Sequence, residues 1–409
     1  MRILIATSSA PFGRGESFVI AEANEMARSG NDVSIFPTVV RRGSPNNFRL
    51  HDRCRLISAR GLTARTILVF LKYVLFRPFL TLRILRGVIS KSRTNTLKNW
   101  VIVPRAFWLA DYISANTVDH IHAHWLTTPA TLAMIVSDIT GIGWSASAHR
   151  GDIVAGNLLA EKFEKATFIR FISESGKGLA KERAPLDSGK ARVLHLGVGV
   201  PSAETRSLKA DRKENEGLKI LCPANLVPVK GHEFLFRSLA RLRAQSGFEV
   251  IIAGEGELKD SLQSMAAELG INHFVRFAGH VPHDTLLRWY ADSEIDIVVL
   301  PSQDLGGGVH EGIPVSLMEA MSFRIPVIST NTGGIPELLV GEQGEAFGGM
   351  VDPQDVGALA ELLDELIESP EQRFRLGQKG FERVAVAFNR EESVASLIKL
   401  IQLQDRCAL

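Results

Sequence analysis

The sequence predicts an α/β protein of two domains, each built around a parallel β-sheet. At 409 residues the chain is too long for one ordinary hydrophobic core and long enough for two domains. In both halves, short apolar runs rich in β-branched residues alternate with stretches whose apolar residues recur at helical spacing. Strands that alternate with helices form parallel sheets covered on both faces. We therefore expect two such domains that face each other across a cleft.

The first domain is expected to span residues 1–201. It opens with a strand over 2–7, a glycine loop, a helix near 18–26 and a strand over 31–36. Further strands are predicted at 118–125, 144–148, 168–173 and 191–198. The glycine loop lacks the third glycine of the dinucleotide fingerprint and no acidic residue closes the second strand, so NAD binding is disfavoured. Gly15 of this loop is expected to let a ligand approach the backbone, and a simple tight turn is the alternative.

A basic segment, residues 53–105, holds twelve Lys or Arg and no Asp or Glu, which leaves 35 basic against 45 acidic residues elsewhere. Helices with an apolar face are expected over 66–77 and 78–86, with charges too frequent for a bilayer-spanning helix. Cationic helices of this kind bind the surface of anionic membranes, which is the favoured interpretation. Ordinary core helices with a solvated face are the alternative. Nucleic acid is disfavoured because the aromatic residues lie among aliphatic ones: Phe70, Tyr73, Phe76 and Phe79.

The cysteines and the first residues of the chain indicate its compartment. Cys54, Cys222 and Cys407 are widely spaced and follow no metal-ligand pattern, which favours a reducing compartment. The apolar run at residues 1–7 is too short for a secretory signal and suits a first strand. We expect a cytoplasmic protein, held peripherally at the inner face of a membrane by its basic segment.

Three histidines, His120, His122 and His124, alternate along the strand predicted at 118–125, so they lie on one face of it. A zinc site would need a further carboxylate or thiolate ligand, and none is spaced to complete it, so no metal site is expected.

A polar loop, residues 149–153, follows the strand predicted at 144–148. Loops at the carboxyl ends of parallel strands are where α/β proteins bind their ligands. His149 is therefore expected at the cleft, and a satisfied structural histidine is the alternative.

The composition changes after residue 201. Residues 202–217 are polar and charged without periodicity, which predicts a linker. A second α/β domain is expected over 218–385, and a final helix over 386–409 is expected to cross back to the first domain. Strands of the second domain are predicted at 218–223, 249–253, 275–281, 295–300 and 325–329.

Two glutamates, Glu311 and Glu319, stand eight positions apart across the start of a predicted helix. Pro314 suits a helix's first position because its missing donor is not needed there. The amides of Val315 and Ser316 would then point outward at an anion. One carboxylate could reach a sugar ring and the other a ribose on either side of a phosphate. This segment therefore predicts a site for a diphosphate sugar.

The whole pattern resembles glycosyltransferase family 4, retaining sugar-nucleotide transferases of the GT-B fold with two Rossmann-like domains. The family's glutamate pair is matched by Glu311 and by Glu319-Ala320-Met321, and its phosphate loop by Lys230-Gly231-His232. Its later glycine pair and glutamate are matched by Gly333, Gly334 and Glu337, and its cleft histidine by His149. The run from Glu311 to Met321, with the loop Gly15-Glu16-Ser17-Phe18, is most similar to the exopolysaccharide and colanic-acid branch.

The resemblance implies transfer of a hexose from a UDP- or GDP-linked sugar to a polyprenyl-diphosphate-linked saccharide in a bacterium, without metal or cofactor. It implies that Lys230 stabilises the leaving diphosphate, Glu311 holds the sugar hydroxyls, Glu319 holds the ribose, and His149 contacts the sugar from the first domain. Further donor-binding residues are expected to be Gly15, Asn225, Gly254, Gly279, Gly312, Ile313, Pro314, Val315 and Ser316. On the acceptor side we expect His124, Arg150 and Asp152.

One position departs from the family pattern. Relatives carry Arg five residues before the phosphate lysine, and this chain has Asn225 there. Asn donates hydrogen bonds but supplies no charge and no bidentate fork. Either another cation such as Arg150 or Arg276 substitutes, or donor binding is weaker, or activity is lost. A transferase with a soluble acceptor and an inactive sugar-nucleotide-binding scaffold are the alternative functions.

Overall fold

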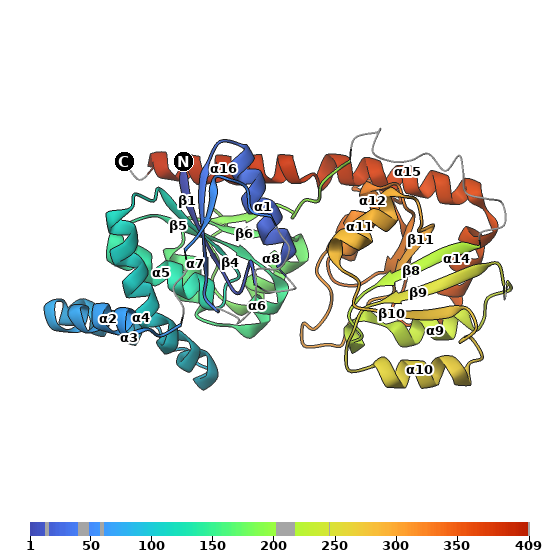
Figure 1. Ribbon diagram of the computed structural model, residues 1–409, viewed down its shortest axis with the longest axis horizontal. Coiled ribbons are helices and arrows are strands. Elements are labelled where there is room, and N and C mark those ends of the chain that lie inside the picture. The colour runs from blue at the N-terminus through green and yellow to red at the C-terminus, as the bar shows by residue number, and fades with distance from the viewer. Residues whose placement is uncertain (13–15, 40–48, 58–60, 202–216, 245, 408–409) are drawn as a thin grey trace. The chain divides into compact units, whose positions relative to one another are not determined.

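The computed structural model describes residues 1–12, 16–39, 49–57, 61–201, 217–244 and 246–407. The chain divides into two compact units, one formed by Met1–His195 with Glu391–Leu409 and the other by Leu196–Arg390 (Figure 1). Of the predicted linker 202–217, only Gly217 lies within the described residues.

The first unit contains a seven-stranded sheet with the order β3-β2-β1-β4-β5-β6-β7, and all of its strand pairs are parallel. Its strands are β1 (Arg2–Thr7), β2 (Asp32–Pro37), β3 (Cys54–Leu56), β4 (His120–His124), β5 (Trp144–Ala148), β6 (Ile169–Phe171) and β7 (Ala191–Val193). Its helices are α1 (Ser17–Arg28), α2 (Ala64–Phe76), α3 (Pro78–Gly87), α4 (Arg93–Ala115), α5 (Thr128–Thr140), α6 (Arg150–Ala155), α7 (Leu159–Lys165), α8 (Glu174–Arg183) and α16 (Arg390–Cys407). The strand order reverses between β1 and β4.

Both faces of this sheet are buried. Alternate residues of β1 point to opposite faces. Ile3 and Ile5 pack with residues of α1 and α16, whereas Leu4 and Ala6 pack with residues of α4 and α5. Leu397 of α16 is fully buried in the first of these clusters, so the end of the chain completes the core of the unit that contains its beginning (Figure 1).

The second unit contains a six-stranded parallel sheet with the order β10-β9-β8-β11-β12-β13. Its strands are β8 (Leu218–Pro223), β9 (Phe248–Ala253), β10 (Val275–Gly279), β11 (Ile297–Leu300), β12 (Val327–Thr330) and β13 (Gly349–Val351). Its helices are the 3-10 turn η2 (Pro228–Lys230), α9 (His232–Leu239), α10 (Lys259–Glu268), α11 (His283–Ala291), α12 (Val315–Ser322), α13 (Ile335–Leu339), α14 (Val356–Glu368) and α15 (Pro370–Ala387). Figure 1 shows α9 and α10 on one face and α11 and α12 on the other, and the strand order reverses between β8 and β11.

The two parallel sheets confirm the predicted fold class, with three local differences. The sequence did not predict β3 and β13, which are three-residue strands at sheet edges and too short to show a periodic pattern. The polar loop expected at 149–153 is largely the helix α6. Helix α12 begins at Val315, one residue later than expected, because Pro314 is extended at the position before it. Within the described part of the chain, no helix is both long enough and apolar enough to cross a membrane.

Candidate active site

The second unit brings Lys230 and Glu311 together at the reversal point of its sheet. Lys230 ends the turn η2, which follows β8, and Glu311 lies in the segment after β11, the strand that pairs with β8. The Lys230 Nζ atom lies 2.7 Å from each carboxylate oxygen of Glu311. Both side chains are partly buried. Ligands of open α/β sheets bind where the strand order reverses, so this ion pair marks the expected position of a site.

The loops around this pair fit closely because they contain glycine. Gly231 has a φ of +67°, and a Cβ atom there would collide with the Pro301 carbonyl and approach the Gln303 side chain. A Cβ atom on Gly254 would collide with the carbonyl of Ala224, directly before Asn225. The segments after β8, β9 and β11 are therefore packed backbone to backbone. This packing places the predicted residues Asn225 and Gly254 next to each other.

The start of α12 lies in the same segment as Glu311. The Pro314 carbonyl accepts hydrogen bonds from the N–H groups of Leu317 and Met318, at 3.2 and 3.3 Å. The amides of Val315 and Ser316 precede these bonds and carry the positive end of the helix dipole. The structure therefore places a helix start at the predicted position, and anion binding there stays a prediction.

Gly333 and Gly334 pack closely against the segment that contains Glu311. A Cβ atom on Gly333 would collide with the Glu311 carbonyl, and one on Gly334 would press against Gly312 and Ile313. The predicted donor-site residues Gly312 and Ile313 therefore lie against the turn before α13. Gly279, at the end of β10, has a φ of +64° and open space around it.

Glu319 forms a contact that the sequence did not predict. It is the fifth residue of α12, and its carboxylate lies 2.7 Å from Nε2 of His283, the first residue of α11. The hydrogen bond to Glu319 raises the pKa of His283, and burial opposes this shift. His283 belongs to no recognised motif. Its position four residues after the predicted donor-site residue Gly279 was the sequence signal that could have placed it near the site.

In the first unit, Glu16 and Trp125 meet at the corresponding reversal point. Glu16 lies in the segment after β1, and Trp125 directly follows β4, the strand paired with β1. The indole N–H of Trp125 donates a 2.7 Å hydrogen bond to Glu16. The Trp125 ring stacks on His149, with centroids 4.0 Å apart and planes inclined by 29°. Gly15, which was predicted to bind the donor, lies outside the described residues.

His149 is a buried, neutral imidazole. Burial lowers its pKa to about 3, with His124 and Arg170 acting in the same direction and Glu22 opposing them. His149 directly precedes α6. Its Nε2 atom has no hydrogen-bond partner among the residues that the structure describes. A neutral imidazole has one donor and one acceptor nitrogen. His149 therefore has a buried ring nitrogen whose hydrogen-bonding capacity is unused among the described residues.

Two residues predicted on the acceptor side are interior residues instead. His124 is fully buried, and its Nε2 lies 3.2 Å from a Glu22 carboxylate oxygen, without hydrogen-bond geometry. Asp152 is also buried and accepts a hydrogen bond from the Leu126 N–H. His124 and Asp152 are thus buried in this structure, and their role on the acceptor side stays a prediction. For His124, strand alternation predicted the face of the side chain and not its depth. Arg150 is half-buried at the start of α6.

The other histidines of β4 pair with serines of β5. Ser145 Oγ lies 2.8 Å from both His120 Nε2 and His122 Nδ1, and Ser147 Oγ lies 2.9 Å from His122 Nε2. His120 and His122 therefore form a buried polar layer with these two serines, which explains why histidines alternate along β4. Over the described parts of the chain, no group of three or more His, Cys, Asp or Glu residues could hold a metal ion.

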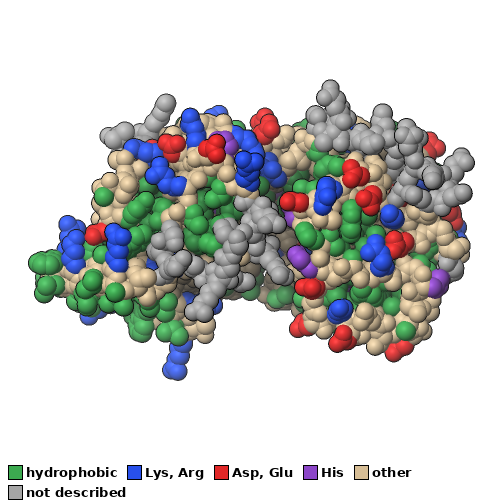
Figure 2. Space-filling model, in the orientation of Figure 1, with side chains coloured by type: hydrophobic (Ala, Val, Ile, Leu, Met, Phe, Trp, Pro, Cys, Tyr) green, Lys and Arg blue, Asp and Glu red, His purple; other side chains and the backbone are tan. Residues whose placement is uncertain are grey.

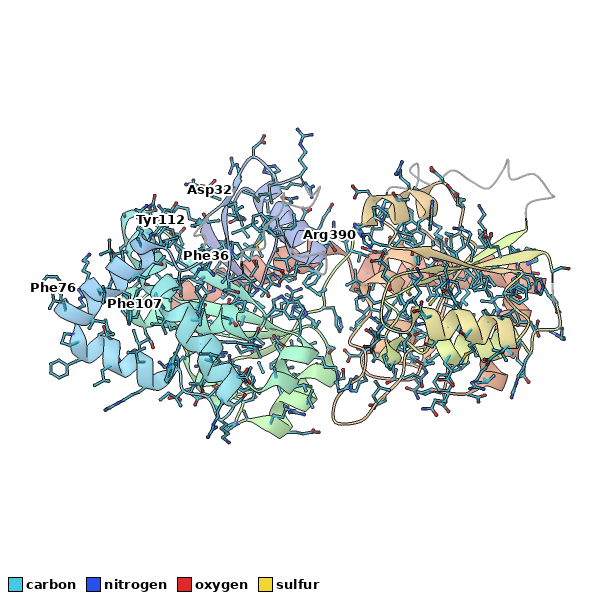
Figure 3. All side chains as sticks on the ribbon, turned by 60° about the horizontal axis from the view of Figure 1, so that its bottom comes forward. Asp32, Phe36, Phe76, Phe107, Tyr112 and Arg390 are labelled. Atoms are coloured by element: carbon cyan, nitrogen blue, oxygen red, sulfur yellow. The ribbon has the colours of Figure 1, made fainter. Side chains whose placement is uncertain are left out.

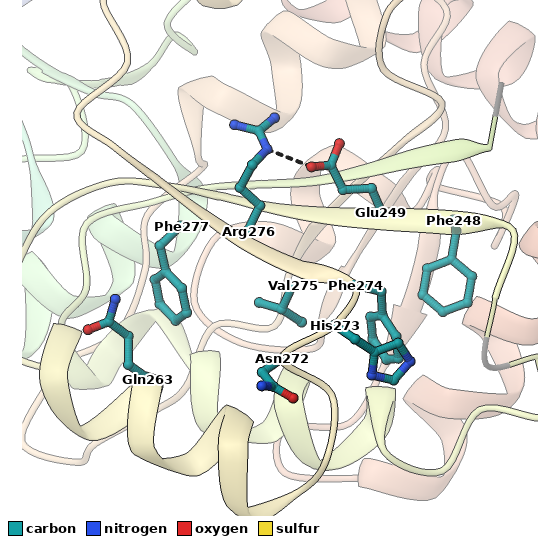
Figure 4. Close-up of a pocket in the computed structure, with 9 residues that line it drawn as sticks. All are labelled: Phe248, Glu249, Gln263, Asn272, His273, Phe274, Val275, Arg276 and Phe277. Carbon is teal, nitrogen blue, oxygen red and sulfur yellow. Dashed lines mark hydrogen bonds and ion pairs between the residues drawn. The ribbon is translucent and has the colours of Figure 1, made fainter.

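Arg276, one of the two suggested substitute cations, does not lie at the site. Its guanidinium pairs with Glu249 at 2.5 Å, beside an open pocket lined by the first residues of β9 and β10 and by Gln263 of α10 (Figure 4). These residues lie toward the amino ends of the strands, whereas Gly254 and Gly279 lie at the carboxyl ends. Neither Arg276 nor this pocket belongs to the reversal-point site.

Comparison with known proteins identifies this architecture. The family "Glycosyl transferases group 1" matches residues 204–383. A GDP-mannose-dependent monoacylated alpha-(1-6)-phosphatidylinositol monomannoside mannosyltransferase of Corynebacterium glutamicum is 30% identical over 318 residues, which cover 73% of this chain and 80% of that protein. WcaL of Salmonella typhimurium, a glycosyltransferase assigned by name to colanic acid biosynthesis, is 32% identical over 221 residues, 52% of this chain and 51% of that protein. Sucrose-phosphate synthase of Thermosynechococcus elongatus matches 98% of both chains with a TM-score of 0.71 at 18% identity.

Two parallel-sheet units with a full-length structural match of this kind define the GT-B fold. The chain belongs to the group 1 glycosyl transferases, the type that corresponds to glycosyltransferase family 4, and it is similar to exopolysaccharide enzymes within that group. These findings confirm the predicted family, fold and enzyme class.

The contact between His283 and Glu319 predicts a pH-dependent stability. A raised pKa in the folded state stabilises the protein fully below the unfolded pKa of about 6.5, and this contribution is lost as the pH rises through the folded value. His283→Gln should therefore lower the melting temperature more at pH 5.5 than at pH 8.5. Differential scanning calorimetry at both pH values measures this, with His273→Gln, at an exposed histidine away from Glu319, as control. An equal loss at both pH values would show that the ion pair does not form.

Proposed function

We propose that this protein transfers a hexose from a nucleotide-diphosphate sugar to a lipid-linked saccharide in cell-surface polysaccharide synthesis, with retention of the anomeric configuration. The observation that carries the proposal is the ion pair of Lys230 and Glu311 at the reversal point, in the same segment as the start of α12. The names of the relatives support the substrate classes, since one uses GDP-mannose with a phosphatidylinositol mannoside and another is assigned to colanic acid.

In this proposal the bond between the anomeric carbon and the diphosphate oxygen breaks, and negative charge develops on the leaving diphosphate. Lys230 and the amides of Val315 and Ser316 stabilise that charge, which is the main catalytic contribution. Glu311 orients Lys230 and accepts hydrogen bonds from the sugar hydroxyls. Glu319 binds the ribose, with His283 as its partner. The acceptor hydroxyl bonds to the anomeric carbon on the face that the diphosphate leaves, and its proton passes to the departing diphosphate oxygen.

The role proposed for His149 of the first unit is contact with the transferred hexose, which rests on the family resemblance. Its imidazole is neutral at physiological pH, so it donates a hydrogen bond to a hydroxyl of the transferred hexose without adding charge. We further propose that transfer needs no metal ion or cofactor, which rests on the family resemblance.

A binding protein without activity is the second candidate, and Asn225 is the observation that favours it. Asn225 lies beside Gly254 and carries no charge where relatives carry Arg. Among the described segments after β8, β9 and β11, the cation paired with Glu311 is Lys230. Screening UDP- and GDP-linked hexoses by thermal shift identifies the donor, since a bound ligand raises the melting temperature. Hydrolysis or transfer of that donor by the purified protein would exclude the inactive alternative.

Replacing Lys230 tests the assigned chemistry. Lys230→Ala should reduce the turnover of the identified donor by roughly a hundredfold or more, the scale of one preorganised electrostatic contact. Lys219→Ala, at the opposite end of β8 from the site, is the matched control and should keep normal turnover. The melting temperature of each variant shows whether it is folded. A folded Lys230→Ala protein with unchanged turnover would contradict the role of Lys230.

Membrane association is the other part of the proposal, and α2 and α3 support it. Phe70 and Tyr73 face inward and pack on Phe107 of α4, with ring centroids 5.6 and 4.7 Å apart. The opposite side of the helix pair is exposed and strongly apolar, with Phe76 at 73% and Phe79 at 87% exposure. Figure 3 shows Phe76 at the outer end of the first unit. The exposed apolar residues of α2 and α3 form what we name the apolar surface. They include Leu68, Leu71, Leu75, Phe76, Phe79 and Leu82.

Basic residues accompany the apolar surface. Figure 2 shows hydrophobic side chains gathered over α2 and α3, with Lys and Arg side chains beside them. Arg77, Arg83, Arg86 and Lys91 are all exposed. Exposed apolar patches that basic residues surround bind the surface of anionic bilayers. This surface would hold the enzyme where a lipid-linked acceptor lies.

Charge reversal tests this surface. Changing Arg77, Arg83, Arg86 and Lys91 to Glu should weaken binding to phosphatidylglycerol-containing vesicles by roughly a hundredfold or more, since each basic residue contributes about 1 kcal/mol. Co-sedimentation with vesicles measures the bound fraction. The matched control reverses four exposed basic residues of the second unit, Arg241, Lys259, Arg375 and Lys379. Persistent binding of the first variant would show that α2 and α3 are ordinary structural helices.

A further inference from the structure

We propose that Trp125 is a positioning residue of the transfer reaction: its indole ring, held by Glu16, sets the orientation of His149. The inference rests on the proposed function, because it deepens the role that His149 has there. Trp125 does not belong to any motif by which the family was recognised.

The position of Trp125 in the fold is the first argument. It follows β4 directly, and Glu16 follows β1, so the two side chains meet where the strand order of the first sheet reverses. Such points are where open α/β sheets bind ligands. Trp125 is only partly buried, unlike a core tryptophan such as Trp144 in β5.

The partners of Glu16 are the second argument. Glu16 is 5% exposed, and its carboxylate accepts hydrogen bonds from the Ser8 N–H at 3.2 Å and from the N–H and Oγ–H of Ser9 at 2.6 and 2.8 Å. The indole N–H of Trp125 completes this set at 2.7 Å. Charge-assisted bonds of this length fix both partners, so the plane of the indole ring is determined by the loop after β1.

The backbone of Trp125 is the third argument. Its φ is +84°, in a region that non-glycine residues rarely adopt. Strained residues persist where their surroundings determine them fully, and they cluster at functional sites. A glycine would adopt this conformation without strain, so the strain at Trp125 favours a functional use of its side chain.

Buried charged groups hold the strained turn. The Trp125 N–H donates to the Ser147 carbonyl at 3.1 Å. The Leu126 N–H donates to the Asp152 carboxylate. Lys162, which is fully buried, donates to the carbonyls of Leu126 and Thr127 at 2.5 and 3.0 Å. Burial raises the pKa of Asp152 and lowers the pKa of Lys162, both to about 7, which shows how unfavourable this environment is for charge. The buried Asp152 thus contributes to the site through the backbone at Trp125.

The ring of His149 is held between two aromatic side chains. It stacks on Trp125 at 4.0 Å, and Phe18 of α1 approaches it with a centroid distance of 5.3 Å. Two aromatic neighbours limit rotation of the imidazole, so its nitrogens keep fixed directions. Hydrogen bonds that act in a transition state require this preorganisation, because a misdirected donor contributes little.

The test is a double-mutant cycle between the two rings. We compare Trp125→Leu, His149→Gln and the double variant, using the sugar nucleotide that gives the largest thermal shift among UDP- and GDP-linked hexoses. Trp125→Leu should lower kcat about tenfold or more with little change in KM for the donor, since the donor's diphosphate is bound by the second unit. The double variant should have the kcat of His149→Gln alone, because Trp125 acts through His149. Trp125→Phe, which retains a stacking ring but loses the hydrogen bond to Glu16, should recover only part of the lost kcat.

The outcomes separate the inference from the function on which it rests. Effects of Trp125→Leu and His149→Gln that multiply in the double variant would overturn the inference and would show that Trp125 contacts the saccharide itself. Normal turnover by His149→Gln would overturn the proposed role of His149 together with the inference.

A second measurement does not depend on turnover. Nuclear magnetic resonance of 13C-labelled histidine should show the His149 ring neutral down to about pH 4 in the wild type and in Trp125→Phe. In Trp125→Leu the ring should protonate at a higher pH, with its signals broadened by exchange between orientations. An unchanged His149 titration and line width in Trp125→Leu would overturn the inference even if the protein proved to be an inactive binder.

Discussion

The structure depends on one constraint, the reversal of strand order in each of its two parallel sheets. The reversal lies between β1 and β4 in the first unit and between β8 and β11 in the second. At each point a carboxylate from one loop meets a nitrogen donor from the other. Glu16 accepts from the Trp125 indole at 2.7 Å, and Glu311 accepts from Lys230 at 2.7 Å. The two units thus present comparable contacts at comparable positions of their folds.

The two contacts differ in charge, and the proposed function assigns them to different parts of a sugar nucleotide. The second unit offers an ammonium group and free helix amides, which suit a diphosphate whose charge increases during transfer. The first unit offers a neutral imidazole between aromatic rings, which suits the hydroxyls and apolar ring faces of a hexose. The glycines Gly231 and Gly254 allow the loops of the second unit to approach each other closely enough to hold the charged pair in place. The exposed apolar helices α2 and α3 lie in the unit that carries the neutral imidazole.

Much of the fold could be predicted from the sequence, because apolar runs and their spacing report directly on strands and helices. The proximity of Lys230 and Glu311 was also predictable, since both follow strands of one parallel sheet. The contacts of Trp125 and His283 could not be predicted, because they join segments that share no pattern and depend on exact loop geometry. Depth was the other limit: alternation placed His124 on one face of β4, but whether that face reaches a ligand depends on the Glu22 and Arg170 side chains packed over it. Arg276 was misjudged because strand periodicity does not show which end of a strand carries the site.

The most direct test of the central claim is calorimetric titration of the free nucleotides GDP and UDP into the wild-type protein and the Glu319→Ala variant. Glu319 is mostly buried and bonded to His283, and in the described part of the chain no hydrogen bond joins it to Lys230 or Glu311, so its replacement tests nucleotide recognition rather than the diphosphate contact. Loss of charged hydrogen bonds to the ribose should weaken binding of the preferred nucleotide by roughly ten- to a hundredfold. Equal affinity of a folded Glu319→Ala protein and the wild type would contradict a nucleotide site at the carboxyl edge of the second sheet.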